Sequence, residues 1–470
     1  MLRMSAERIA EATQGQLVAG DGSVMANGLS IDSREVQPGN AFVALVGEHA
    51  DGHDFVRAAV DAGARVVIVT RADEPVLEAV AGSRHPEAAV VLVADAVAAI
   101  QAMAAYHRSR LTCPVVGVTG STGKTTTKDF MRAALATTFK VVASEGNRNN
   151  QLGVPLTIFE AGADTGALVV EMAMRGPGQI AELAAIARPT HGLVTNVGLS
   201  HVGVLGSQEA IAEAKGELVE AIPESGAVFL NGDDAWTARL RERARARVVT
   251  YGTSEECDVR AEEIAVDEDG LPVFTLVAGD ARASVKLPVL GKHNVYNALA
   301  AAAVALDLGV ELERVVNGLA EARMSGMRMD VFESASGVTV INDAYNANPV
   351  SMRAAISALM DTRAAGKRIA VLGDMAELGS LAELAHFQLG EEVGRSGIDV
   401  LVTVGTLARR IAEGARAEGM GPDAVRPCAT PEEASEVLDD LLEAGDVVLV
   451  KASRVMGLER VVEGIIRPHV

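Results

Sequence analysis

The sequence has few cysteines and aromatic residues and no long, uninterrupted apolar run. Its three cysteines, Cys113, Cys257 and Cys428, lie far apart in a chain of 470 residues, so neither a disulfide framework nor the spacing of a zinc site is visible. The alanine-rich stretch 88–105 is broken by polar residues, which argues against a membrane span there. These absences fit a reducing compartment, and we expect a soluble, cytoplasmic protein.

Positive charge is also scarce. The chain has 42 Lys and Arg residues against 63 Asp and Glu residues, which gives a formal net charge of −21. Such a surface repels polyanions, which argues against nucleic acid or an anionic membrane as a partner. The first residues include Arg3, Glu7 and Arg8 and lack the apolar segment of a secretory signal. An anionic ligand must therefore be bound by local cations and helix N-termini.

The chain is rich in aliphatic residues and too long for a single core. Short apolar runs alternate with helical periodicity, which predicts an α/β protein of three domains, at residues 1–95, 96–322 and 323–470. We expect a small α/β domain first. A mainly parallel, doubly wound sheet with an antiparallel appendix at 259–289 follows, and then a second βα series. Asn294 is the predicted N-cap of an alanine-rich helix.

The most informative segment is 114–128. An apolar run is followed by a turn of small residues, and helical periodicity begins at Lys124. Backbone N–H groups of such a turn bind phosphate, the lysine reaches the β- and γ-phosphates, and the Thr125 hydroxyl suits Mg²⁺. The spacing is the short Gly120-x-x-Gly123-Lys-Thr, because Val118 stands where the longer motif has glycine. The alternative is an ordinary glycine-rich turn between a strand and a helix.

Polar residues end two further strand-like runs of the middle part, at Glu171 and Asn196, and His201 follows shortly after. These strand ends should face the phosphates. A carboxylate, the Thr125 hydroxyl and a histidine as ligand or outer partner would suit Mg²⁺. The alternatives are a capping or surface carboxylate and a structural histidine. Lys215 lies on a predicted helix, where the sequence alone favours a solvated lysine.

Polar loops also mark the first and last parts. Ser33 and Arg34 offer a hydroxyl and a guanidinium to a phosphate, although turn chemistry and a surface charge are the alternative. In the last part, Asp343 at a strand end would accept ribose hydroxyls, and Arg328 precedes the first predicted strand and could approach a γ-phosphate. Further polar residues follow the strands of this part: the amides Asn346 and Asn348, and the cluster Lys451, Ser453 and Arg454.

Several segments together resemble the Mur ligases, over nearly the whole chain. They are Thr119–Thr127, Glu171-Met, Thr195-Asn-Val-Gly-x-x-His201, Ala214-Lys-Gly-Glu217, Gly291-x-His-Asn-x-x-Asn297 and Asn342–Pro349. Within that family, Asn342–Pro349, Gly373–Gly379 and Lys451–Arg454 resemble the members that join D-alanyl-D-alanine to UDP-N-acetylmuramoyl-tripeptide. Asp32-Ser-Arg34 and Asp51-Gly-His53 resemble their nucleotide-sugar domain.

The resemblance implies a nucleotide-sugar-binding first domain, an ATP-binding middle domain and a Rossmann-like last domain. It implies that ATP phosphates bind Gly120, Ser121, Thr122, Gly123, Lys124, Thr125 and Thr126. Adenine would lie near Asn294 and Asn297, ribose at Asp343 and the γ-phosphate at Arg328. Two Mg²⁺ ions would be associated with Thr125, Glu171, His201 and a carbamylated Lys215, which reverses the surface assignment of that lysine. Substrate would contact Ser33, Arg34, Asn149, Asn150, Tyr345, Asn346, Asn348, Lys451, Ser453 and Arg454.

The implied reaction is amide synthesis. ATP phosphorylates the peptide carboxylate to an acyl phosphate, and the amine of D-alanyl-D-alanine then attacks. Lys124, Lys215, His201 and Arg328 would be the catalytic residues, and we expect a monomer.

Three alternatives stay open. Folylpolyglutamate synthase has the same reaction type but lacks a nucleotide-sugar domain, whereas about a hundred residues precede the phosphate loop here. The Mur ligase that adds a diamino acid would carry an Asp-Asn-Pro-Arg-type motif, which is absent from the sequence. A nucleotide-gated binding protein without ligase activity is the alternative from another class.

Overall fold

The computed structural model describes residues 2–200 and 202–466. Within these residues, none of the helices is both long and apolar enough to cross a membrane. The chain divides into two compact units. The first comprises Met1–Gly117, Phe139–Ala173 and Gln179–His191, and the second comprises Val118–Thr138, Met174–Gly178 and Gly192–Val470.

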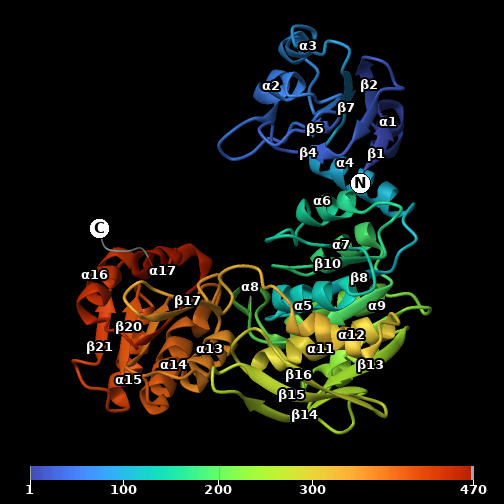
Figure 1. Ribbon diagram of the computed structural model, residues 1–470. Coiled ribbons are helices and arrows are strands. Elements are labelled where there is room, and N and C mark those ends of the chain that lie inside the picture. The colour runs from blue at the N-terminus through green and yellow to red at the C-terminus, as the bar shows by residue number, and fades with distance from the viewer. Residues whose placement is uncertain (1, 201, 467–470) are drawn as a thin grey trace. The chain divides into compact units, whose positions relative to one another are not determined.

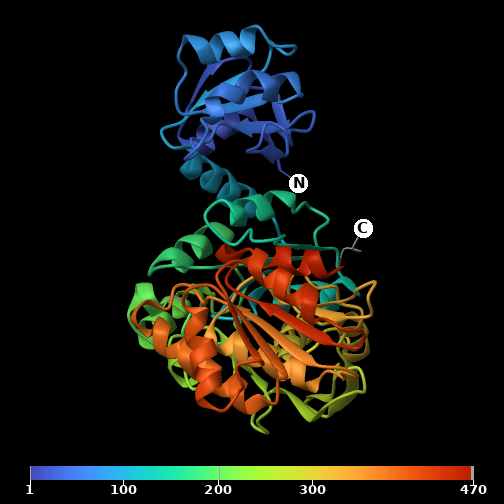
Figure 2. The ribbon, with the colours of Figure 1, turned by 90° about the vertical axis from the view of Figure 1, so that its left-hand side faces the viewer.

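The N-terminal part of the first unit is a small α/β sheet with its helices (Figures 1 and 2). Its elements are β1 (Arg3–Ser5), α1 (Ala6–Thr13), β2 (Gln16–Ala19), β3 (Met25–Asn27), β4 (Leu29–Ser30), β5 (Ala41–Val43), η1 (Gly52–Phe55), α2 (Val56–Asp61), β6 (Val66–Val69), α3 (Glu74–Ala81), β7 (Ala89–Leu92) and α4 (Ala96–Arg108). The sheet order is β2-β7-β6-β5-β4, with β4 to β7 parallel and β2 antiparallel at the edge.

One core joins this sheet to α2 and α3. Phe42, Val67 and Val90 of the strands pack with Val60 of α2 and Val80 of α3. The central strands β5 and β6 are short, apolar and buried throughout, as parallel strands covered on both faces must be. The loops after β4, β5 and β6 therefore emerge at the same edge of the sheet, which is where parallel α/β sheets bind ligands.

The middle of the chain forms a larger sheet that contains the phosphate loop. Its elements are β8 (Val115–Thr119), α5 (Lys124–Ala136), β9 (Val141–Ala143), α6 (Gly153–Glu160), β10 (Ala167–Glu171), α7 (Gln179–Ala187), β11 (His191–Val194), α8 (Val202–Leu205), α9 (Gln208–Ala221), β12 (Ala227–Asn231), α10 (Thr237–Glu242), β13 (Arg247–Gly252), β14 (Val259–Val266), β15 (Pro272–Ala278), β16 (Ala281–Lys286), α11 (His293–Asp307) and α12 (Leu312–Ala320). In the described residues the order is β16-β15-β14-β13-β12-β11-β8-β10-β9.

The predicted antiparallel appendix is confirmed, because β15 pairs antiparallel with both β14 and β16. α11 packs against α5, the helix that follows the phosphate loop. The run Ala300–Ala303 in α11 is completely buried, and such small side chains allow two helices to approach closely.

The predicted N-cap at Asn294 is wrong. Helix α11 begins one residue earlier, at His293, and Asn294 lies inside its first turn. Its side-chain amide donates to the backbone carbonyl of Leu290 at 2.8 Å instead of accepting from the helix N-terminus. The sequence signal failed because Asn in a first turn can bond backward as well as forward.

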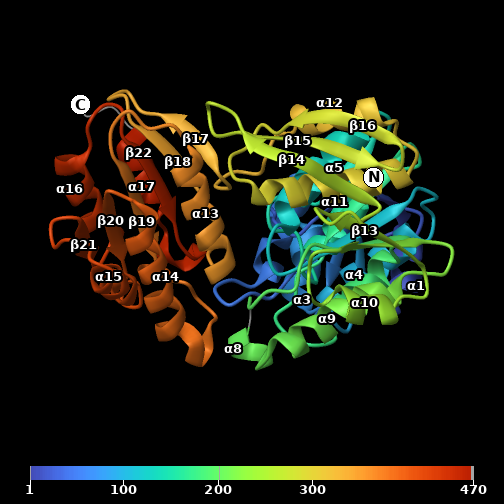
Figure 3. The same cartoon turned by 90° about the horizontal axis from the view of Figure 1, so that it is seen from below.

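The C-terminal part has its own sheet, seen in Figure 3, in the order β17-β18-β22-β19-β20-β21. Its elements are β17 (Asp330–Glu333), β18 (Thr339–Asn342), α13 (Pro349–Asp361), β19 (Arg368–Gly373), η2 (Gly379–Leu381), α14 (Ala382–Ser396), β20 (Val400–Val404), α15 (Ala408–Ala417), β21 (Val425–Cys428), α16 (Pro431–Leu441), β22 (Val447–Lys451), η3 (Arg454–Met456) and α17 (Glu459–Ile466). Every residue of β20 and β22 is buried, as expected for a sheet covered on both faces.

Two strands of this sheet were not predicted. β17 is an antiparallel edge strand with exposed Val331 and Phe332, and β21 contains Pro427 and Cys428. Both are short edge strands, where the apolar pattern is weak and proline is tolerated. The α/β class with parallel-rich sheets is confirmed.

Helices α14 and α15 approach closely through glycine. A Cβ on Gly390 would lie 2.0 Å from the carbonyl oxygen of Ile411, and one on Gly414 would lie 2.1 Å from that of Phe387. Backbone atoms cannot yield by so much without separating the helices.

We therefore predict that Gly390→Ala lowers the free energy of unfolding by about 3 kcal/mol through overpacking. Hydrogen exchange of the α14 and α15 amides should accelerate in this variant. Gly421→Ala is the matched control, because nothing lies within 4 Å of a Cβ there. Equal exchange in the two variants would contradict the close approach.

Candidate active site

The phosphate loop connects β8 to α5 and depends on two glycines. Gly120 has φ 151° and Gly123 has φ 78°, conformations that favour glycine. A Cβ at Gly120 would lie 1.8 Å from Thr195 Oγ1, and one at Gly123 would lie 2.3 Å from Asn297 Oδ1. The strand, loop and helix predicted from the sequence are therefore present, with neighbouring side chains packed directly against the loop.

The segment after β11 fixes the loop by hydrogen bonds. Thr195 Oγ1 donates to the carbonyl oxygen of Thr122 at 2.6 Å, and Asn196 Oδ1 accepts from the Thr122 N–H at 3.1 Å. The Asn196 carbonyl also accepts from the Ser121 N–H at 3.0 Å. These bonds hold the backbone of the turn in one conformation. From the sequence, Asn196 is predicted only as a polar strand end and as part of the motif from Thr195 to His201, and no role is predicted for Thr195.

Lys124 lies over the loop that precedes it. Its Nζ donates to the carbonyl oxygen of Gly120 at 2.8 Å. The lysine is also the first residue of α5, so its charge and the N-terminal N–H groups of the helix serve the same loop. This arrangement fits an anionic ligand such as a nucleotide phosphate.

Lys215 is buried, and the assignment as a solvated surface lysine is wrong. It lies on α9 with a relative exposure of 1%. Burial lowers the pKa of the Lys215 ammonium well below its ordinary value, and the positive charge of Lys124 acts in the same direction. The helix pattern could not reveal this, because it carries no information on groups distant in sequence, such as Lys124, whose charge acts on Lys215.

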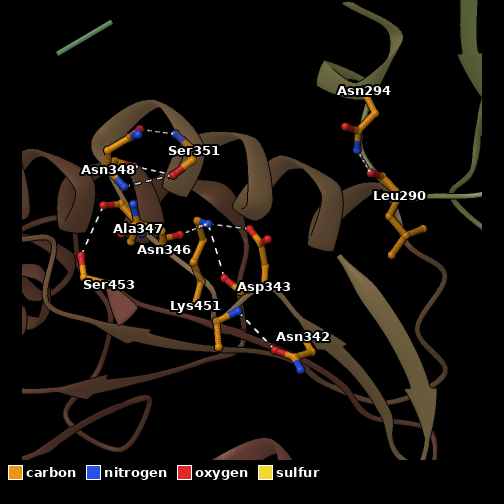
Figure 4. A network of polar contacts seen from close by, with 11 residues as sticks. Leu290, Asn294, Asn342, Asp343, Asn346, Ala347, Asn348, Ser351, Lys451 and Ser453 are labelled. Carbon is orange, nitrogen blue, oxygen red and sulfur yellow. Dashed lines mark hydrogen bonds and ion pairs between the residues drawn. The ribbon is translucent and has the colours of Figure 1, made fainter. Parts of the chain in front are cut away.

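In the C-terminal part, Lys451 is paired with Asp343. Lys451 Nζ donates to Asp343 Oδ2 at 2.5 Å and to the carbonyl oxygen of Asn346 at 2.8 Å, and Figure 4 shows the lysine pointing at both. The Lys451 side chain is only 3% exposed. The pair connects the end of β22 with the loop after β18, so Lys451 stabilises the predicted substrate loop.

The same loop is held at its far end. Ser453 Oγ accepts from the Ala376 N–H at 2.8 Å. It also donates to the Ala347 carbonyl at 3.4 Å (Figure 4). Asn348 is the N-cap of α13 and forms a capping box with Ser351. Asn348 Nδ2 also donates to Ser200 Oγ at 3.0 Å. The structure thus brings together most of the C-terminal residues predicted from the sequence.

Arg328 and Arg454 precede and follow this sheet. The Arg328 guanidinium stacks on the ring of Tyr345, with Cζ 3.9 Å from the ring centroid. Arg328 Nε is buried and has no hydrogen-bond partner among the residues that the structure describes. Arg454 pairs with Glu459 at 3.1 Å and is half exposed.

In the first unit, Glu171 is a buried residue at the end of β10. Its Oε1 accepts from Asn149 Nδ2 at 2.9 Å, and its backbone N–H donates to Ser144 Oγ at 3.1 Å. Asn150 Oδ1 accepts from the N–H groups of Leu152 and Gly153 at the start of α6. A surface role for Glu171 is thereby excluded.

Arg34 in the N-terminal part is highly exposed and is paired with its neighbour Asp32. The guanidinium donates from Nε at 2.9 Å and from Nη2 at 2.6 Å. These hydrogen bonds lower the pKa of the Asp32 carboxyl to about 2. Ser33 lies between them in the same loop after β4.

Comparison with known proteins agrees with this geometry. Three family models match the chain: "Mur ligase family, catalytic domain" at residues 26–107, "Mur ligase middle domain" at 118–305, and "Mur ligase, glutamate ligase domain" at 327–454. A curated relative from Mycobacterium bovis, the UDP-N-acetylmuramoyl-tripeptide--D-alanyl-D-alanine ligase, is 42% identical over 93% of this chain and 92% of its own. The chain belongs to the Mur ligase family.

Solved structures of this family match over the whole length. MurF from Acinetobacter baumannii has a TM-score of 0.88 at 32% identity and covers 99% of both chains. MurF ligase from Thermotoga maritima in complex with ADP has a TM-score of 0.79 at 30% identity and covers 94% of this chain and 97% of its own. The three-domain arrangement of the Mur ligases is therefore confirmed, and ATP use follows from membership of the family.

The residues of this chain fit a nucleotide. The loop glycines, the α5 N-terminus and the unpartnered buried Nε of Arg328 all suit phosphate oxygens. Asn297 packs against Gly123 of the loop. Its Nδ2 donates to Asn294 Oδ1 at 2.8 Å, and its Oδ1 accepts from Thr127 Oγ1 at 3.2 Å. Their predicted place near adenine stays a prediction.

The metal assignments also stay predictions. His201 lies outside the described residues. Glu171 belongs to the first unit and Thr125 to the second. Within the described residues, His, Cys, Asp and Glu side chains do not form a group of three or more that could bind a metal. The predicted set depends instead on the Thr125 hydroxyl and on a modified Lys215.

The buried Lys215 predicts a pH dependence of stability. The folded-state pKa of Lys215 lies below its ordinary value of 10.5, so between these two pKa values the unfolded chain binds more protons than the folded chain, and stability rises with pH in that window. In CO₂-free buffer, Lys215→Met should remove this rise, which amounts to at most about 1.4 kcal/mol per pH unit. Denaturant unfolding of both proteins at pH 7 to 9 measures the difference. Lys140→Met is the control, because Lys140 is exposed; parallel curves for wild type and Lys215→Met would contradict a neutral lysine.

Proposed function

We propose that this chain is an ATP-dependent ligase that joins D-alanyl-D-alanine to UDP-N-acetylmuramoyl-tripeptide. The observation that carries this proposal is the match to relatives bearing that name, which covers 93% of this chain. The phosphate loop and the ordered loops of the C-terminal sheet are the parts that such a reaction requires. The Mur ligase that adds a diamino acid is a less supported alternative, because its motif is absent from the sequence.

The reaction activates a carboxylate and then replaces phosphate by an amine. An oxygen of the tripeptide carboxylate attacks the γ-phosphorus of ATP, which gives an acyl phosphate and releases ADP. The amine of D-alanyl-D-alanine attacks the acyl carbon, phosphate leaves with the electron pair of the C–O bond, and the amine gives up a proton. The products are the amide, ADP and phosphate.

Local cations supply the electrostatic stabilisation of this transfer. Lys124 and the N-terminus of α5 hold the β- and γ-phosphates, and Arg328 neutralises charge on the transferred phosphoryl group. Asp343 accepts from the ribose hydroxyls, and Lys451 keeps its carboxylate in place. Ser33 and Arg34 contact the uridine diphosphate group, while Asn149 and Asn150 line the acceptor peptide. The loop with Tyr345, Asn346 and Asn348, together with Ser453 and Arg454, faces the substrates.

Magnesium would supply Lewis-acid stabilisation to the phosphates through Thr125, Glu171 and His201. We also propose that Lys215 is carbamylated: its neutral amine adds to CO₂ and releases one proton, which turns an amine into an anionic oxygen ligand. The low pKa of the buried Lys215 supports this, because only the neutral amine reacts. We further propose that the enzyme acts in the cytoplasm as a monomer.

A substrate-omission assay tests the reaction. Phosphate release and product mass should require ATP, UDP-N-acetylmuramoyl-tripeptide and D-alanyl-D-alanine together. Lys124→Ala should reduce turnover by about 10³-fold or more, the scale for a group that stabilises transition-state charge. Lys140→Ala is the matched control and should keep wild-type activity. Phosphate release that is unaffected by omitting the dipeptide would contradict the proposal.

Carbamylation has its own test. Lys215→Ala should lose activity, and a short carboxylic acid such as formate should restore part of it by supplying the missing carboxylate. The intact wild-type protein should lose the mass of one CO₂ on acidification, and Lys215→Ala should not. Failure of both rescue and mass shift would refute the modification while leaving the ligase assignment intact.

A further inference from the structure

The stacking of Arg328 on Tyr345 is the closest cation–aromatic contact in the described residues. Arg328 Cζ lies 3.9 Å from the ring centroid, whereas the other pairs lie between 5.4 and 5.9 Å apart. At 3.9 Å the guanidinium plane is in van der Waals contact with the ring, where attraction to the aromatic face is strongest.

We propose that Tyr345 is a positioning residue for Arg328, whose guanidinium it holds ready for a phosphoryl group. The inference deepens the proposed function and rests on it. The resemblance to the Mur ligases implies that Tyr345 contacts substrate. The geometry adds a role in which it acts through Arg328.

The backbone around Arg328 supports this role. Both flanking methionines, Met327 and Met329, adopt left-handed conformations with φ 60° and 59°. Such conformations are unfavourable for non-glycine residues and persist only where contacts enforce them. Here the Met327 N–H donates to Asp330 Oδ2 at 2.5 Å, and the Met327 carbonyl accepts from the Tyr345 N–H at 3.3 Å. Tyr345 therefore holds the turn through its backbone and the guanidinium through its ring.

Because its partner is an aromatic ring and not a carboxylate, Arg328 keeps its positive charge available for a phosphoryl group. Lys451 and Arg454 each have a carboxylate partner, at 2.5 and 3.1 Å. Asp330 acts on Arg328 electrostatically, but its carboxylate accepts from the Met327 N–H, and no ion pair of Arg328 within 4.0 Å is present in the described residues. A carboxylate in direct contact would compete with phosphoryl oxygens for the N–H groups of Arg328. The face of Tyr345 orients the guanidinium without accepting its in-plane hydrogen bonds, and Nε has no partner in the described part of the chain. A phosphoryl oxygen would accept the hydrogen bond that the buried Arg328 Nε–H lacks.

The test compares variants at 345 that differ in the aromatic face. Tyr345→Phe keeps the ring, whereas Tyr345→Leu removes it and keeps an apolar side chain. Replacement by pentafluorophenylalanine keeps the ring shape and reverses its charge distribution. This variant replaces Tyr345→Leu in the test if the leucine variant does not fold. For each variant we would measure affinity for ADP, affinity for a non-hydrolysable ATP analogue, kcat, and the thermal midpoint.

Tyr345→Phe is the reference variant, because it removes the hydroxyl and keeps the ring. Relative to Tyr345→Phe, Tyr345→Leu and the fluorinated variant should keep ADP affinity but lose about 3- to 30-fold in kcat and in preference for the ATP analogue over ADP, the range that cation–aromatic energies give. Two double variants complete the test: Arg328→Ala with Tyr345→Phe, and Arg328→Ala with Tyr345→Leu. Both should show the same preference for the ATP analogue over ADP, because the arginine that the ring positions is absent.

Two outcomes would overturn the inference. One is a fluorinated or leucine variant that keeps wild-type kcat and nucleotide preference. The other is an equal loss in Tyr345→Phe and Tyr345→Leu, which would assign the effect to the hydroxyl. Wild-type protein that fails to join D-alanyl-D-alanine to the tripeptide would instead refute the proposed function, so the two failures are distinguishable.

Discussion

The steric exclusion of a single methyl group at the phosphate loop is the constraint on which the site depends. Thr195 Oγ1 occupies the place of a Cβ at Gly120, and Asn297 Oδ1 occupies that place at Gly123. Thr195 also fixes the loop, because its hydroxyl donates to the Thr122 carbonyl, and Asn297 accepts from Thr127 in the helix that follows the loop. The turn is therefore rigid before a ligand arrives, which avoids the cost of ordering it on binding.

Electrostatics adds a second constraint, since a chain of net charge −21 must bind anionic substrates. In this fold, each cation near the site has its own partner or environment. Arg34 and Lys451 are paired with carboxylates, Lys215 is buried and loses its proton readily, and Arg328 is held by an aromatic ring. The charges that remain directed at the site are thus few and local, whereas the rest of the surface stays acidic. Local fields of this kind act over a Debye length of about 8 Å in physiological salt.

Much of this could be predicted from sequence, and the exceptions have physical causes. The phosphate loop was visible because glycine spacing and helical periodicity are local signals. The burial of Lys215 was not visible, since helical periodicity alone favoured a solvated lysine; only the family resemblance indicated a role in the site. Asn294 was misassigned because one amide can bond forward or backward along a helix start. The contact between Arg328 and Tyr345 joins a turn and a strand end 17 residues apart, and no spacing rule indicates it.

The helix that begins at the phosphate loop also holds the segment that carries Arg328. Asp129 of α5 accepts from the Ser325 N–H at 2.8 Å, and Lys128 Nζ lies 2.8 Å from the same carboxylate. Lys128 and Asp129 are each about 3% exposed, and a buried charge must keep its partners because an unpaired one is costly. Ser325 is thus fixed to α5, and Met327 is fixed to Tyr345. Since close-packed contacts transmit small displacements, the positions of α5 and Arg328 are coupled through Ser325 and the three residues of chain that follow it. The lysine and the arginine proposed to act on one phosphoryl group are therefore mechanically linked.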